Sequence, residues 1–482
     1  MTLFNIKNSI ASLLTVLALC FVGCKKFTEK PYDNRIELKF TEHYQQILAD
    51  AYPARHEMFT DILTDDYDFH TNLAQASIVG YFLPMYLWKD DYPDNNFTGP
   101  DLAYREFYAK IYRSNIVISG VMGSEKGSAE LKAAVLGEAL VLRAYCHFML
   151  VNLFGQHYNP STAASDLGVP VVTEVNEDNV KHYARNTVQE VYAQIEKDAA
   201  EGIAQLQKGG NSVSKNPYHF SLASANAFMS RVKLYKGEWA ASIKFADAVI
   251  ADKGRIVRDL ATDLTLITQS GIQFFTAKYM DPTTHPNILL DYYSPSLSFL
   301  APTGFTLCGF FPADNITPVF TSQDLRAKLL YPVGTVIDKR VMVTKYEVQP
   351  NNPNGSFRAS YLSMEEVLLN RAEAVLRSGG TVQDALTDLE VLRKARYSPY
   401  TALNPAGLST ADLLTTVLLE RRKEFINEGL RWFDVKRLGL KVDHSLSRGQ
   451  APETLQANDL RKVLQIPRKE REGNPNIQLN PR

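Results

Sequence analysis

Residues 131–154 are predicted to form a helix that other parts of the chain must cover on two sides. One apolar face repeats at steps of four and three residues, and it consists of Val135, Ala139, Leu142, Cys146, Met149 and Leu153. A second face consists of Leu136, Leu140 and Phe148, with Arg143 and His147 on the polar seam. A helix that is apolar on two sides is predicted to be buried on both of them by other parts of the chain.

Two later segments, 222–252 and 361–396, are predicted to form helical hairpins of one shape. A glycine-containing turn joins the two helices of each hairpin, at Lys236-Gly237-Glu238 and at Ser378-Gly379-Gly380. The apolar spacing resembles that of tetratricopeptide repeats, whose hairpins must stack to bury their apolar faces. Together with the long helix, the hairpin regions are expected over about 129–155, 187–252 and 361–396. Because these copies are dispersed, long insertions are expected between them.

Two of the insertions, about 81–100 and 281–318, are rich in aromatic residues and proline. Loops of this length inside a folded domain are usually functional. A sugar ring presents an apolar C–H face on which Trp or Tyr can stack, while Asn, Asp or Arg bind its hydroxyls. The candidate ligand-binding residues are Trp88, Tyr86, Tyr92, Asp90, Asn95, Tyr292 and Phe310. Two alternatives remain open, in which these rings pack beneath the loops or form a surface for a protein partner.

The first 24 residues have the pattern of a bacterial lipoprotein leader. Lys7 precedes the apolar run 10–22, which is too short to span a bilayer but suits a signal peptide. The run leads into the sequence FVGC, and a lipoprotein signal peptidase would remove residues 1–23 and leave a lipid on Cys24. An ordinary secretory signal followed by an incidental cysteine remains the alternative. In both cases the chain is expected to leave the cytoplasm.

Beyond the leader, residues 24–35 are polar and are predicted to be a flexible tether, and 36–482 to be a single domain. The formal net charge of the full chain is −1, so there is no basic excess for binding nucleic acid. No later apolar stretch is expected to span a membrane. Cys146 and Cys308 could form one disulfide, although two free, buried thiols are favoured.

Signatures of catalysis, metal binding and cofactor binding are not found in the sequence. There is no HExxH, GxSxG, P-loop, GxGxxG or CxxC motif. The pairs Asp65-Asp66 and Asp90-Asp91 could be glycosidase acids, but adjacent acids are more often solvated turns. The sequence therefore favours a binding protein without a cofactor or a metal, and not an enzyme.

Several segments together resemble the SusD/RagB family of Bacteroidetes outer-membrane lipoproteins. The longest match is 418–439, LLERRKEFINEGLRWFDVKRLG. Within it, the residues that fit the family's signature are Glu420, Arg421, Glu424, Phe425, Glu428, Gly429, Arg431, Trp432, Asp434 and Arg437. The segments 108–118, 137–155, 237–250, 367–380 and 466–481 are also similar to the family. The resemblance therefore extends over most of the chain that follows the leader.

The resemblance implies a mostly α-helical fold, a tetratricopeptide-like helical scaffold with a loop-rich ligand-binding half and few short strands. It also implies a lipid-anchored outer-membrane protein at the cell surface, which captures a glycan and delivers it to a SusC-like TonB-dependent transporter. The alternatives are a peptide-capturing RagB-like protein and a helical-repeat envelope scaffold without a small ligand. The signature around Trp432 is expected to be architectural. Trp88 lies in roughly the region where glycan-binding members place an aromatic platform.

Overall fold

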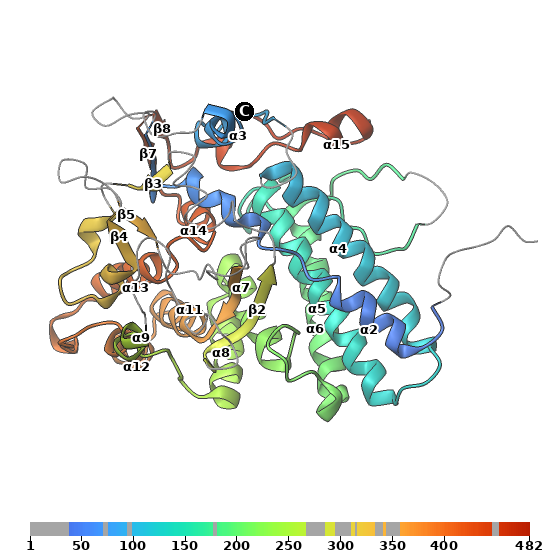
Figure 1. Cartoon of the computed structure of the whole chain (residues 1–482), viewed down its shortest axis with the longest axis horizontal. Helices are drawn as coiled ribbons and strands as arrows, with labels where there is room; N and C mark the ends of the chain where they lie inside the picture. Colours follow the sequence, from blue (N-terminus) through green and yellow to red (C-terminus); the bar gives the residue numbers. More distant parts are fainter. Residues whose placement is uncertain are drawn as a thin grey trace, which may run out of the picture. The chain divides into compact units, whose positions relative to one another are not determined.

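The computed structural model of the chain describes residues 38–482, except 71–75, 94–98, 177–180, 267–284, 295–309, 314–315, 333–340, 344–356 and 446–452 (Figure 1). The leader, Cys24, Asn95 and Cys308 lie outside the described residues. Residues Phe40–Arg482 form one compact unit, and the description below concerns this unit.

The long helix predicted over 131–154 is α5 (Ala129–Phe154), and it lies among helices as its two apolar faces require. Helices α4 (Pro100–Gly120) and α6 (Val188–Gly209) pack against it, and α2 (Thr41–Ala49) lies along α4 and α5 (Figure 1). By length and composition α5 could cross a membrane, contrary to the sequence-based expectation. Its apolar stretch is buried within the protein, however, as in the core helix of a globular domain.

Helices α5 and α6 approach each other closely because glycines lie between them. A Cβ atom added to Gly137 of α5 would lie 2.7 Å from the backbone oxygen of Gly202 on α6. The same pair of helices shares a buried ion pair, in which Arg143 Nε and Nη2 donate to Asp198 Oδ2 and Oδ1 at 2.8 and 2.7 Å. The polar seam of α5 is therefore satisfied by a carboxylate on the neighbouring helix.

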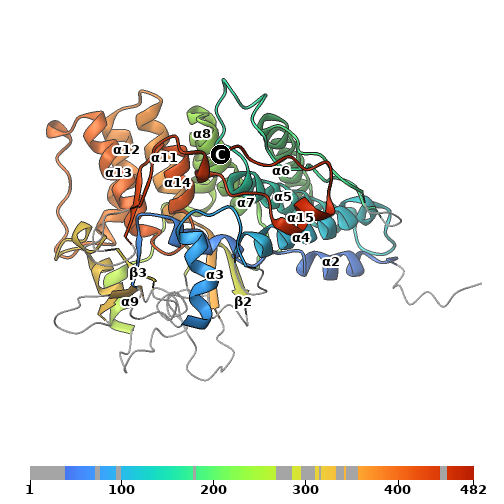
Figure 2. The same cartoon turned by 90° about the horizontal axis from the view of Figure 1, so that it is seen from above.

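The two predicted hairpins form at the expected places. The first comprises α7 (Leu222–Lys236) and α8 (Trp239–Lys253), and the second comprises α11 (Met364–Arg377) and α12 (Val382–Lys394). Gly237 ends α7 with φ of +75°, the left-handed conformation that favours glycine. Helix α11 packs against α7, α8 and α12, and also against α13 (Thr410–Glu424) (Figure 2). Stacking of neighbouring helices thus buries the apolar faces.

The signature segment 418–439 is part of the scaffold. It covers the end of α13 and the short helix α14 (Arg431–Arg437), and the Trp432 side chain is fully buried. Arg421 is also buried, and its Nε donates to Asp434 Oδ2 at 3.0 Å. Gly429 has φ of +72°, and a Cβ atom there would lie 3.1 Å from the Cα atom of Met58. These buried contacts support the architectural role expected for the signature.

Within the described residues, the strands form four two-stranded antiparallel sheets. The pairs are β1 (Tyr67–Phe69) with β3 (Phe310–Pro312), β2 (Ile288–Ser294) with β6 (Phe357–Ser363), β4 (Leu330–Pro332) with β5 (Val341–Val343), and β7 (Val442–His444) with β8 (Glu453–Leu455). The shorter helical elements include the 3₁₀ helix His56–Leu63, α9 (Leu260–Leu266) and α15 (Arg468–Gly473).

Both predicted aromatic insertions contain more regular structure than expected. Residues 81–86 are the end of α3 (Ala76–Tyr86), which contains Pro84. A loop was expected here, but the side chains of Phe82, Met85 and Tyr86 are fully buried, and their burial outweighs the one backbone hydrogen bond that Pro84 cannot donate. The second insertion contributes β2 and β3.

Candidate functional site

Trp88 lies two residues after the end of α3, and its backbone has a left-handed conformation that glycine usually takes. Its φ is +50°. The N–H of Trp88 donates to the carbonyl oxygen of Met85 at 2.9 Å, and that of Lys89 to Pro84 at 2.9 Å. These two bonds form the Schellman motif that commonly ends helices. A bulky residue in this left-handed conformation is strained, and such strain is concentrated at functional sites.

The strained position puts the indole of Trp88 against His444 of β7. The two rings stack with centroids 4.2 Å apart, and Tyr86 stacks on the other face of His444 at 3.9 Å. Indole Nε1 of Trp88 donates to the carbonyl oxygen of Leu63 at 3.1 Å. Only 3% of Trp88 is exposed, so the ring as it stands packs against protein on most of its surface.

His444 lies at the centre of this stack, and burial lowers its pKa to about 4. Its Nδ1 lies 2.7 Å from the carbonyl oxygen of Tyr86, and its Nε2 lies 2.9 Å from that of Thr64. A neutral imidazole donates from one nitrogen only, so one of these two contacts lacks a proton. Ring stacking on both faces of His444 adds to these polar contacts.

A cavity of about 390 Å³ lies beside Trp88, and we call it the Trp88 cavity. It is lined by Leu87, Trp88, Lys89, Asp90, Asp459, Leu460, Arg461 and Arg482. Asp90 pairs with Arg482, and Asp459 Oδ2 accepts from Arg461 Nη2 at 2.7 Å. The guanidinium carbon of Arg461 lies 5.8 Å from the centroid of the Trp88 ring. Carboxylates and guanidinium groups at a partly exposed rim can exchange these partners for ligand hydroxyls.

The other residues predicted for ligand binding are placed differently. Tyr92 is half-buried, and Asn95 lies outside the described residues. Phe310 lies on β3 opposite Phe69 of β1, and the ring of Phe69 is 6.1 Å from that of Tyr86. Tyr292 lies on β2 and pairs with β6. The structure thus brings the backbone of Phe310 toward the stack at Trp88, whereas Tyr292 belongs to a separate sheet.

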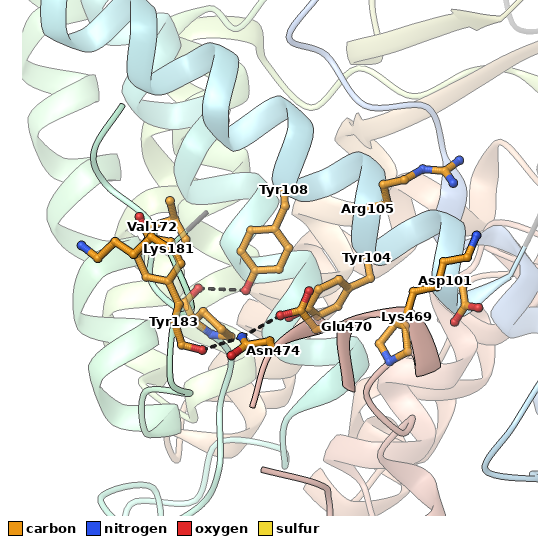
Figure 3. Close-up of a pocket in the computed structure, with 12 residues that line it drawn as sticks. Asp101, Tyr104, Arg105, Tyr108, Val172, Lys181, Tyr183, Lys469, Glu470 and Asn474 are labelled. Carbon is orange, nitrogen blue, oxygen red and sulfur yellow. Dashed lines mark hydrogen bonds between the residues drawn. The ribbon is translucent and has the colours of Figure 1, made fainter. Parts of the chain in front are cut away.

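A second cavity was not predicted from the sequence, and we call it the Tyr104 cleft (Figure 3). It has a volume of about 440 Å³ and lies between α4, residues 170–172 and 181–183, and the segment that contains α15. Its lining residues are Asp101, Tyr104, Arg105, Tyr108, Pro170, Val172, Lys181, Tyr183, Pro467, Lys469, Glu470 and Asn474. The spacing of Asp101, Tyr104, Arg105 and Tyr108 along one helical face is the signal that could have indicated it.

The cavities combine aromatic rings with charged groups of both signs, an arrangement that suits binding. Among the residues that the structure describes, no group of three or more His, Cys, Asp or Glu side chains could hold a metal ion. Cys146 is a free, buried thiol, and burial raises its pKa well above the usual range for a thiol. It is therefore a packing residue of α5.

Two family models match the chain. A SusD-like family described as starch-binding and associating with the outer membrane matches residues 26–234, and the SusD family (SusD/RagB) matches residues 336–482. The chain is similar to SusD-like protein P2 of Formosa agariphila, with 23% identity over 96% of this chain and 97% of the relative.

Solved structures show the same fold. A SusD superfamily protein from Bacteroides thetaiotaomicron matches with a TM-score of 0.76 and 21% identity, over 92% of this chain and 100% of that protein. A laminarin-binding SusD-like protein matches with a TM-score of 0.65 and 17% identity, over 92% of this chain and 99% of that protein.

Proposed function

The chain belongs to the SusD/RagB family, and we propose that it is a non-catalytic binding lipoprotein that captures a glycan at the cell surface. The observation that carries this proposal is the pair of family matches, one described as starch-binding and associating with the outer membrane. That description supports an outer-membrane location. A laminarin-binding protein of the same fold gives further support for a glycan as ligand.

The leader and the family together suggest how the protein works in the envelope. In this proposal the lipid on Cys24 anchors the chain to the outer membrane, and the domain presents bound glycan to a SusC-like TonB-dependent transporter. No catalytic step is required, because the transporter takes up the glycan as it is delivered. Binding and release are therefore the only chemistry asked of the domain.

Within the domain, we propose that the glycan binds around the Trp88 cavity. Asp90 and Tyr92 are exposed enough to meet a ligand, and 47% of the Asp90 side chain is in contact with solvent. Tyr86 and Trp88 are buried in the stack on His444, so in this proposal they form the wall that positions the exposed groups. Phe310 and Tyr292 come from the second aromatic segment, and Asn95 from the first; all three remain proposed ligand contacts.

A binding screen tests the proposal. The chain without its leader (residues 25–482) keeps the whole compact unit Phe40–Arg482, and it is titrated with starch, laminarin, maltoheptaose, other plant and algal glycans, and peptide pools. We expect binding to one glycan class and a loss of about tenfold or more in affinity for Asp90→Ala. Asp252→Ala, an exposed aspartate at the end of α8, is the matched control.

Each outcome of the screen separates the candidate functions. Binding of peptides and not of glycans would replace the proposal with the peptide-capturing alternative. Binding of neither would favour the envelope scaffold. Glycan binding that Asp90→Ala leaves unchanged would keep the function and move the site away from the Trp88 cavity.

A further inference from the structure

The Tyr104 cleft and the Trp88 cavity share no lining residue. The cleft is built from three parts of the chain that are far apart in sequence: the first half of α4, residues 170–172 with 181–183, and residues 467–474. Figure 2 shows α15 lying beside α4. If both cavities bind ligand, one domain would have two separate ligand-binding sites.

The aromatic surface of the cleft is fixed in the unliganded protein. The rings of Tyr104 and Tyr108 lie one helical turn apart, with centroids 4.7 Å apart. Tyr104 meets the ring of Phe154 edge-on at 5.1 Å, and the hydroxyl of Tyr108 donates to the carbonyl oxygen of Pro170 at 2.9 Å. These contacts hold both rings in place, so a ligand would lose little free energy in ordering them.

A third ring completes the aromatic lining. Tyr183 is half-buried, and its hydroxyl donates to Glu174 Oε1 at 2.9 Å. The carbonyl oxygen of Tyr183 accepts from Asn474 Nδ2 at 2.9 Å, which ties this stretch to the segment after α15. In Figure 3, Tyr183 and Lys181 lie at one end of the row of residues, Asp101 and Lys469 at the other, and Tyr108 and Tyr104 between them.

Charged groups of both signs line the cleft, and this selects the kind of ligand. Carboxylates come from Asp101 and Glu470, and cations from Arg105, Lys181 and Lys469. A strongly acidic or basic ligand would meet groups of its own sign, whereas neutral hydroxyls can accept from the cations and donate to the carboxylates. The Arg105 side chain is 53% exposed, and its ion pair with Glu106 is long, with 3.6 Å between Nε and Oε1. Turning Arg105 toward a ligand would therefore cost little free energy.

We propose that the Tyr104 cleft is a second carbohydrate-binding site, which holds a short neutral oligosaccharide or the end of a longer chain. This inference rests on the proposed glycan-binding function and adds a second site to it. The half-buried rings of Tyr108 and Tyr183 take the apolar faces of the sugars, with the buried ring of Tyr104 packed beside Tyr108, and the flanking charged groups take the hydroxyls. The volume is within the usual range for small-ligand sites, roughly 300–1,000 Å³.

Two variants on the lining test the site. Val172→Trp fills the cleft with a larger side chain. The backbone hydrogen bonds of this residue, from its N–H to His147 and from Asn115 to its carbonyl oxygen, can stay in place. Tyr183→Ala removes one ring without adding bulk. The matched control is Tyr112→Ala, because Tyr112 lies one turn beyond Tyr108 on α4, is 41% exposed and does not line the cleft.

The probes are maltoheptaose and laminarihexaose, titrated calorimetrically into residues 25–482 and into the variants. We expect wild type and Tyr112→Ala to bind at two sites, and both cleft variants to lose one site or weaken it by about tenfold or more. Asp90→Ala should leave that second site intact. If Val172→Trp does not fold, as judged by circular dichroism, Tyr183→Ala decides.

Two results would overturn the inference, and they are distinguishable. Binding that both cleft variants leave unchanged removes the second site but keeps the proposed function. Failure of wild type to bind either probe removes the site for neutral glucans, and failure across the whole glycan screen also removes the proposed function. Peptide binding in the cleft, abolished by Val172→Trp, would assign the cleft to another ligand class and overturn the inference.

Discussion

The indole ring of Trp88 stacks on the imidazole ring of His444, with the two planes 17° apart and the centroids separated by 4.2 Å. Trp88 follows α3, and His444 lies far along the chain on β7. The left-handed backbone of Trp88 is what allows the contact, because it turns the chain back at the end of the helix. Strain in one segment is thus offset by packing against another.

Replacing Trp88 by glycine and by alanine separates the effect of backbone strain from the effect of ring packing. Both variants lose the stack, and each is expected to lower the free energy of unfolding by about 3 kcal/mol. Trp88→Gly is expected to be more stable than Trp88→Ala by up to about 1 kcal/mol, because glycine takes a left-handed conformation without strain. Urea unfolding of the two variants measures the difference. A more stable alanine variant would contradict the strain described for this residue.

Removing the His444 ring should leave the rings of Tyr86 and Trp88 without their shared stacking partner. His444→Ala is expected to lower the free energy of unfolding by about 2–4 kcal/mol, because Tyr86 and Trp88 each lose a buried stacking partner. It should also raise the quenching of Trp88 fluorescence by acrylamide, with Trp88→Phe identifying that signal. His182→Ala, at an exposed histidine, is the control. Unchanged quenching in His444→Ala would mean that other contacts hold the indole.

Acid should destabilise the fold before its carboxylates titrate. Burial lowers the pKa of His56, His147 and His444 to about 4, and that of His157 to about 3. Below about pH 6.5 the unfolded chain takes up protons that the folded chain refuses, so stability falls by up to about 1.4 kcal/mol per pH unit for each histidine. The stability is fully present above pH 6.5 and is lost as the pH falls toward 4.

Urea unfolding at pH 7, 6 and 5 measures this slope. His147 is the clearest single contributor, because its Nε2 accepts from the N–H of Val172 at 3.3 Å and must be unprotonated to do so. His147→Gln is expected to reduce the slope of the unfolding free energy against pH by the equivalent of about one proton, or up to about 1.4 kcal/mol per pH unit. A stability that is flat between pH 7 and 5 would show that these histidines take up protons in the folded chain as readily as in the unfolded chain.

Removing one partner of the buried Arg143–Asp198 pair should lower the free energy of unfolding strongly, whereas replacing both with apolar residues should lower it much less. Arg143→Met leaves the fully buried carboxylate of Asp198 without its partner, and it is expected to cost about 3–5 kcal/mol. Arg143→Met combined with Asp198→Leu removes both charges, and it should recover much of this loss. The free energies of unfolding of the two variants provide the comparison. Equal losses would indicate that Asn115, which also accepts from Arg143 at 2.8 Å, carries the effect.

The close contact of α5 and α6 predicts a sharp dependence on one methyl group. Gly137→Ala places a Cβ atom 2.7 Å from backbone atoms of α6, so the helices must separate, at a cost of about 1–3 kcal/mol. Gly123→Ala is the control, since nothing lies within 4 Å of the added atom. Melting temperatures of the two variants test the prediction. A tolerated Gly137→Ala would mean that α6 can move.

Helices with a clear period could be predicted from the sequence, because their apolar faces are local patterns. The apolar steps of 131–154 indicated α5, and the glycine turns at Gly237 and Gly379 indicated the hairpins. The end of α3 was missed, since Pro84 is a reliable helix breaker only where burial does not outweigh it. Local pattern does not report how strongly a segment is buried by distant residues.

The candidate site was predicted less well, because its geometry depends on contacts across the chain. Trp88 was identified by residue type, but its burial depends on His444, which no local pattern connects to it. The Tyr104 cleft needs residues after 170 and after 467 to face α4. Only its α4 side, with Tyr104 and Tyr108 on one face, was available to sequence reasoning.

The charges on α5 also bear on the export that the leader predicts. A protein exported through a translocon passes as an unfolded chain, and α5 is long and apolar enough to be released sideways into the bilayer. A central arginine opposes such release by about 2.5–3.5 kcal/mol. In such an export, Arg143, which the folded protein pairs with Asp198, is expected to keep this segment from entering the bilayer before the chain folds. An Arg143→Leu, Asp198→Leu variant that folds in vitro should accumulate in the inner membrane when expressed with its leader, as fractionation would measure.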